Sequence, residues 1–165
     1  MPVSEQGVDL SRYMLIPRVL IFLTRGSSVL LLKGAPTKRL WGNLYNGVGG
    51  HVARGEDILS AARRELFEET GLTANLRLCG MVVVDTGGTP GIGMVVFTGK
   101  YLQGELLSSS EGKSEWIPFA RVPELPVVED LPVFLERIRK MKPGDPPFMA
   151  RSFYTDGKLT VEFAK

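Results

Sequence analysis

The chain has 165 residues, of which 44% are hydrophobic and 23% charged, as expected of a globular protein with a single core. Its formal net charge of +2 argues against a broad nucleic-acid-binding face, so we expect no nucleic-acid polymer as a partner. A single cysteine, Cys79, and a single histidine exclude an internal disulfide framework and a zinc site built from these residues.

The sequence near the start of the chain indicates neither a signal peptide nor a membrane span. The apolar run from Tyr13 to Thr24 is too short to cross a bilayer, and Pro17 and Arg18 interrupt it. The cysteine content fits a reducing compartment, so we expect a cytoplasmic protein that does not bind membranes. We expect one domain over residues 1–165, with residues 1–11 either flexible or forming an edge strand.

Two short apolar runs predict buried strands near the start of the chain. Val19–Leu23 and Val29–Leu32 are continuously apolar and are separated by a turn at residues 25–28. Strands of this type are buried on both faces, so we expect helices on both sides of the sheet.

A loop over residues 33–45 follows and carries candidate ligand-binding side chains. Lys33, Lys38 and Arg39 are either phosphate contacts or solvated charges. Trp41 is either a packing anchor, a lid residue or a platform on which a base stacks.

Glycines dominate the next stretch, from Asn46 to Gly50. They would allow the backbone to approach a ligand and leave the carbonyl of Gly50 free to coordinate a cation, although an irregular bulged strand also favours glycine. His51 follows, either as a phosphate contact or as an exposed bystander.

The stretch after these glycines predicts a helix. Asp57 is a suitable N-cap, the residues Ile58, Ala62 and Leu66 form an apolar stripe, and Gly71 can end the helix in a left-handed conformation.

Three glutamates share one face of this helix. Glu65, Glu68 and Glu69 stand at positions i, i+3 and i+4, where like charges repel by a few tenths of a kcal/mol per pair. The helix C-terminus disfavours each negative charge by about 0.3–1 kcal/mol. A bound Mg²⁺ or Mn²⁺ would reverse both effects, and the alternative is a solvated acidic patch.

The remaining chain predicts further strands and one more helix. We expect strands at 75–84 and 93–101 joined by a turn at 85–91, a polar loop at 103–114, a short strand at 115–119, a helix at 130–141, a linker at 142–147, and a closing hairpin of 148–154 with 159–163.

The stretch from Gly50 to Leu72 resembles the signature of the Nudix hydrolases without a departure. The matching positions are Gly50, Glu56, Arg64, Glu65, Leu66, Glu68, Glu69, Gly71 and Leu72. The resemblance implies an α/β/α sandwich with a mixed β-sheet. It also implies hydrolysis of a nucleoside diphosphate linked to another group.

The same resemblance implies roles for the motif residues. Glu68, Glu69 and the Gly50 carbonyl would be metal ligands, for Mg²⁺ or alternatively Mn²⁺. Glu65 would be either a further ligand or the catalytic base. Arg64 would pair with a carboxylate, and Glu56 would either pair with Arg64 or ligate a second metal.

Family members often recruit one more carboxylate from outside the motif. Glu111 is our first candidate and Glu105 our second.

The stretch around Asn46 is similar to the MutT-type branch, which removes oxidised purine nucleoside triphosphates such as 8-oxo-dGTP. In that branch the asparagine can contact the base, while a lysine commonly stands in place of His51. We take Asn46, Trp41, Lys33 and Arg39 as substrate-binding candidates. An ADP-ribose or nucleotide-sugar pyrophosphatase and a non-catalytic ligand-sensing module are the alternatives, and the protein is expected to be a monomer or a homodimer.

Overall fold

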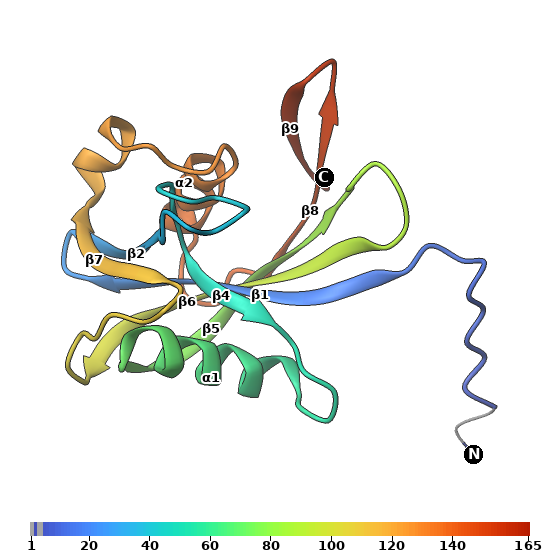
Figure 1. Cartoon of the computed structure of the whole chain (residues 1–165), viewed down its shortest axis with the longest axis horizontal. Coiled ribbons are helices and arrows are strands. Elements are labelled where there is room, and N and C mark those ends of the chain that lie inside the picture. Colours follow the sequence, from blue (N-terminus) through green and yellow to red (C-terminus); the bar gives the residue numbers. More distant parts are fainter. Residues whose placement is uncertain (1, 3–4) are drawn as a thin grey trace.

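The computed structural model describes Pro2 and residues 5–165. Within these residues, nine strands form one mixed sheet with a helix on each side (Figure 1). The elements in chain order are β1 (Leu15–Arg25), β2 (Ser28–Gly34), β3 (Tyr45–Asn46), β4 (Val48–His51), α1 (Ile58–Thr70), β5 (Thr73–Val84), β6 (Gly91–Gln103), β7 (Gly112–Pro118), a 3₁₀ helix η2 (Phe119–Glu124), α2 (Leu131–Lys140), β8 (Phe148–Thr155) and β9 (Lys158–Phe163).

Strand β1 lies inside the sheet, and its three partner strands, β2, β4 and β6, decide where the site forms. The sheet order is β3-β2-β1-β6-β5-β8-β9, with β4 paired to β1 and β7 paired to β2. β1 is parallel to β6, β5 is parallel to β8, and the other pairs are antiparallel. Residues 18–21 in the middle of β1 pair with β4, and its last two residues pair with β2. This change of partner along β1 places Gly50 opposite Val19 and Gly49 opposite Leu20, with His51 opposite Arg18.

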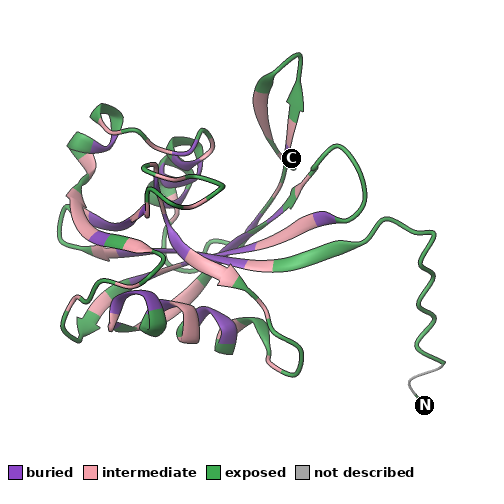
Figure 2. Cartoon of the chain, viewed as in Figure 1, coloured by how far each residue is buried: buried purple, intermediate pink, exposed green. Residues whose placement is uncertain are grey.

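The alternation of side chains along β1 produces two cores. Val19, Ile21 and Leu23 pack on the side of α1, against Ala61, Ala62 and Leu66 of the helix. Leu20 and Phe22 pack on the opposite side, with Leu131, Phe134, Leu135 and Ile138 of α2. Figure 2 shows the buried residues concentrated where the helices meet the sheet. The expected α/β/α arrangement with a mixed sheet is therefore confirmed.

Both ends of α1 form as the sequence predicts. The Asp57 carboxylate accepts hydrogen bonds from the backbone N–H groups of Leu59 and Ser60, each at 2.9 Å. Gly71 ends the helix with φ of 72°, and its N–H donates to the Phe67 carbonyl at 2.8 Å. Ile58, the first residue of the predicted stripe, remains 38% exposed, so the buried stripe begins one turn later.

Several strand boundaries differ from the predicted ones. β1 begins at Leu15 instead of Val19, and it includes Pro17, because neighbouring β6 supplies a parallel partner along this whole segment. β7 begins at Gly112, inside the predicted loop 103–114, because Gly112, Lys113 and Ser114 pair with the end of β2. The 3₁₀ helix η2 was not predicted.

The closing hairpin is confirmed and has a second role. β8 and β9 pair as an antiparallel hairpin, and β8 also joins the main sheet by parallel pairing with residues 80–84 of β5.

The start of the chain contributes no strand before Leu15 in the part that the structure describes. Of the segment predicted to be flexible or an edge strand, residues 1, 3 and 4 lie outside the described residues. None of the described helices is long and apolar enough to cross a membrane.

Candidate active site

Among the described residues, two hollows adjoin where β4 meets α1 and the loops that follow β2 and β6. The larger has a volume of about 430 Å³, which is in the range of small-molecule sites, and the smaller about 350 Å³. They share Gly49, Gly50, His51, Glu69 and Glu111 as lining residues. A ligand with an apolar and an anionic part could therefore occupy both at once.

The smaller hollow is acidic, because α1 presents its glutamates to β4. Glu65, Glu68 and Glu69 line it together with Glu111, Ser109 and Ser110. Oε2 of Glu69 accepts a hydrogen bond from the Gly49 N–H at 3.2 Å. The Glu65 carboxylate lies against Gly50 so closely that a Cβ there would be 2.6 Å from its Oε2. Glycine at position 50 thus leaves the space that the Glu65 carboxylate occupies in this position.

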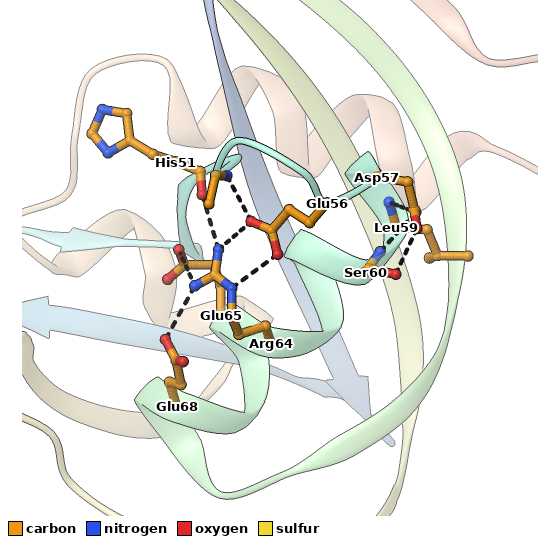
Figure 3. Close-up of polar contacts among 9 residues, drawn as sticks. His51, Glu56, Asp57, Leu59, Ser60, Arg64, Glu65 and Glu68 are labelled. Atoms are coloured by element: carbon orange, nitrogen blue, oxygen red, sulfur yellow. Dashed lines mark hydrogen bonds and ion pairs between the residues drawn. The ribbon is translucent and has the colours of Figure 1, made fainter.

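Arg64 holds the polar network around these glutamates (Figure 3). Its Nε and Nη2 donate to both oxygens of Glu56, at 3.1 and 2.6 Å. Nη1 donates to Glu65 at 2.9 Å and to Glu68 at 3.1 Å, and Nη2 also donates to the His51 carbonyl at 3.1 Å. Glu56 in turn accepts from the Ala53 N–H at 2.7 Å. Arg64 therefore ties the loop before α1, the helix itself and the end of β4 into one unit.

Hydrogen bonds, burial and nearby charges shift the pKa values of several groups at this site. Hydrogen bonds from Arg64 lower the pKa of Glu56, and the hydrogen bonds to Glu56 and Glu65 raise the pKa of Arg64. Burial raises the pKa of Glu69 to about 7, and the nearby charges of Glu65 and Glu111 act in the same direction.

The oxygen donors of the smaller hollow fit a hard divalent cation in type. Glu69 is desolvated beside two other carboxylates, an arrangement that a cation would relieve. Within the described part of the chain, however, no three His, Cys, Asp or Glu side chains already converge as a metal cluster. The reason is visible in Figure 3, where Glu65 and Glu68 both point to the Arg64 guanidinium. A cation here would compete with Arg64 for them.

Of the two candidates for an extra carboxylate, Glu111 reaches the site. It lines both hollows, and its carboxylate forms an ion pair with Lys38. Its backbone carbonyl accepts a hydrogen bond from the Ala35 N–H, with 3.0 Å between nitrogen and oxygen. These contacts join the loop after β2 to the loop before β7. Glu105 does not line either hollow, and its carbonyl lies instead beside Gly71 at the end of α1.

The larger hollow contains three of the four predicted substrate-binding residues, Asn46, Trp41 and Arg39. The Asn46 side-chain oxygen accepts from the Gly47 N–H at 2.8 Å, which leaves the amide N–H groups available to a ligand. Lys33 lies outside both hollows, so the structure does not support a substrate contact for it. Side chains alternate along β2, and Leu32 and Gly34 take the positions that line the hollow. The Lys33 ammonium instead lies 5.7 Å from the centre of the Tyr45 ring.

Trp41 is held at the hollow by its backbone and is not a packing anchor. The residue is 48% exposed, and its φ of 61° is unusual for a bulky residue. The Trp41 carbonyl accepts a hydrogen bond from the Leu44 N–H at 3.1 Å. The Gly34 N–H donates to the Leu44 carbonyl, and the Gly34 carbonyl accepts from the Asn43 N–H. Unfavourable backbone conformations of this kind concentrate at ligand sites.

Sequence reasoning missed Arg18 as a site residue. It lies on β1 directly opposite His51 of β4, lines the larger hollow, and donates from Nε to Nε2 of His51 at 3.1 Å. The signal available in the sequence was a charged residue interrupting an apolar run, which we interpreted only as evidence against a membrane span.

Comparisons with known proteins find similar sequences and similar folds. Residues 14–138 match the NUDIX domain. The oxidized purine nucleoside triphosphate hydrolase of Danio rerio is 33% identical over 106 residues, which are 63% of this chain and 67% of that protein. The NAD-capped RNA hydrolase NudC of Haemophilus influenzae is 33% identical over 114 residues, but these are 42% of its length. A crystal structure of a MutT protein from Bacillus halodurans superposes with a TM-score of 0.76 at 27% identity, over 90% of this chain and 97% of that one.

Proposed function

Because this chain belongs to the Nudix hydrolase family, we propose that it is a pyrophosphohydrolase of nucleoside triphosphates, with oxidised purine nucleotides such as 8-oxo-dGTP as its substrate class. The products are a nucleoside monophosphate and pyrophosphate, and Mg²⁺ is the cofactor, with Mn²⁺ as a substitute. The pairing of a largely apolar hollow with an adjoining acidic one carries this proposal.

The larger hollow suits the nucleoside and the smaller one the phosphates. Leu20, Leu44 and Met94 give the larger hollow apolar walls, and Trp41 offers a ring on which a base can stack. The shared residues Gly49 and Gly50 lie where the sugar and the first phosphate would pass from one hollow to the other.

The carboxylates of α1 would hold the cation. Glu68, Glu69 and the Gly50 carbonyl are the proposed ligands. When bound, a divalent cation neutralises phosphate charge and lowers the pKa of water. Glu65, fixed by Arg64 and packed against Gly50, is either a further ligand or the group that takes the proton of the attacking water. Arg64 and Glu56 act by orienting these carboxylates.

A panel of nucleotides tests the proposal directly. The chain is incubated with Mg²⁺ and 8-oxo-dGTP, dGTP, dATP, ADP-ribose or a nucleotide sugar, and the products are separated by chromatography. We expect the highest kcat/KM for an oxidised purine triphosphate, with pyrophosphate released in one step. Cleavage of ADP-ribose far faster than of any triphosphate would assign the chain to the alternative pyrophosphatase class. Absence of turnover with every substrate, at millimolar Mg²⁺ or Mn²⁺, would indicate a non-catalytic module.

A further inference from the structure

We infer that Arg18 reads the base of the nucleotide and makes the larger hollow select 6-oxopurines, the guanine type, over adenine. This inference rests on the proposed function, since it assumes that a nucleoside occupies this hollow. It assigns a specificity-determining role to a residue outside the Nudix signature.

The position of Arg18 favours a contact to the nucleoside part of the ligand. Arg18 stands in a row across three strands, opposite His51 of β4 and opposite Met94 of β6. All three residues line the larger hollow, and Arg18 is absent from the lining of the acidic one. A phosphate held beside the α1 glutamates would therefore be nearer to other groups than to Arg18.

The guanidinium of Arg18 has unused hydrogen-bonding capacity. It is partly buried, and burial lowers the pKa of Arg18. Of its five N–H donors, the Nε–H binds Nε2 of His51, and no carboxylate forms an ion pair with Arg18 among the described residues. A partly desolvated cation without a carboxylate partner, lining a cavity, is expected to meet acceptor atoms of a ligand.

The other polar groups of the hollow are also mostly donors. Asn46 has its oxygen occupied and its amide N–H groups available, and Arg39 adds a second guanidinium. The two carboxylates at the boundary are engaged, Glu69 with the Gly49 N–H and Glu111 with Lys38. A base that offers acceptors is therefore favoured over one that offers a donor.

Guanine and adenine differ in this respect. Guanine presents N7 and O6 as two adjacent acceptors, which arginine can bind with two parallel hydrogen bonds, whereas adenine replaces O6 by an amino donor. In an oxidised guanine with a carbonyl at C8, N7 carries a hydrogen and becomes a donor, so Arg18 would keep only the contact to O6, the acceptor that adenine lacks. Arg18 would then discriminate against adenine because its N–H groups would face the amino group.

His51 serves as a positioning residue in this arrangement. Its carbonyl is fixed by Nη2 of Arg64, and its Nε2 accepts from Arg18. The Nudix motif thereby sets the orientation of the guanidinium that lines the neighbouring hollow. A His51→Gln variant keeps an acceptor for Arg18, whereas a His51→Leu variant does not.

Titration calorimetry with nucleoside monophosphates tests base recognition without turnover. The probes are GMP, IMP and AMP, where IMP shares O6 with GMP and lacks its 2-amino group. The wild type should bind GMP and IMP with similar Kd values and AMP more weakly. Arg18→Met should reduce the AMP-to-GMP ratio of Kd values by between about fivefold and a hundredfold. Arg18→Lys should retain part of the ratio.

The control is Arg12→Met, which removes an arginine from the exposed segment before β1 and should leave all three Kd values unchanged. Thermal unfolding of each variant shows whether it is folded. If Arg18→Met does not fold, the Kd values of Arg18→Lys decide the test. His51→Leu should reduce the AMP-to-GMP ratio more than His51→Gln.

The inference is overturned if Arg18 variants weaken all three ligands equally, which would indicate a phosphate or stacking contact, or if IMP behaves like AMP. Loss of the proposed function has a different signature. Selective GMP binding that depends on Arg18, without hydrolysis of any triphosphate, would refute the proposed reaction and leave base recognition by Arg18 intact. Triphosphate hydrolysis with an unchanged ratio in the Arg18 variants would refute only the role of Arg18.

Discussion

Substitution of Gly50 by alanine should separate activity from folding. A Cβ at this position would lie 2.6 Å from Oε2 of Glu65 and closer still to the carboxyl carbon, whereas ordinary contact begins at 3.4 Å. The side chain of Glu65 can move, so the carboxylate has to withdraw by about 1 Å, and a displacement of that size at a catalytic group can lower a rate by about a hundredfold. The backbone at Gly50 needs no positive φ, so the strand itself tolerates alanine.

The assay is steady-state turnover of the best triphosphate substrate together with thermal unfolding. We expect Gly50→Ala to lower kcat by about a hundredfold with little change in Tm. Gly88→Ala is the matched control, because its added Cβ meets nothing within 4 Å and its φ is not positive. Gly49→Ala is the contrasting case, since its Cβ would collide with the main-chain carbonyl of Val19 and should lower Tm as well. A Gly50→Ala enzyme with a kcat within about threefold of the wild type would refute the reasoning that Glu65 must lie against this glycine.

Three further predictions concern single side chains. Glu69→Gln keeps an acceptor for the Gly49 N–H, so it should abolish turnover while leaving Tm nearly unchanged, and an active variant would contradict the proposed ligand role. Asp57→Ala removes the cap of α1 and should lower the free energy of unfolding by about 0.5–2 kcal/mol in denaturant titrations, with kcat preserved. The hydrogen bond to Glu115 raises the pKa of Tyr45 to about 12, above its ordinary value of 10.0, so its stabilisation is complete below pH 10 and lost as the pH rises towards 12. Tyr45→Phe should therefore remove part of the decline in stability that the wild type shows between these pH values, and identical stability profiles would exclude the coupling.

Interactions between residues close in the sequence were sufficient to predict α1 and the acidic face that it carries. Asp57, the spacing of Ala62 and Leu66, and Gly71 act through contacts within a few residues, so the helix and both of its ends follow from the sequence. The same spacing places Glu65, Glu68 and Glu69 on one face without any tertiary information. The helix α2 and the closing hairpin were predictable for the same reason.

Long-range pairing decided what the sequence could not show. Arg18 and His51 are 33 residues apart and meet because β1 pairs with β4, while β7 is extended to Gly112 by its partner β2. The side of β2 on which Lys33 lies, and the choice of Glu111 over Glu105, likewise depend on where distant strands and loops pack. The sequence by itself determined a helix with three glutamates on one face, because helical spacing is local. Only the tertiary structure determined which groups surround the larger hollow, because register between strands is set by the whole sheet.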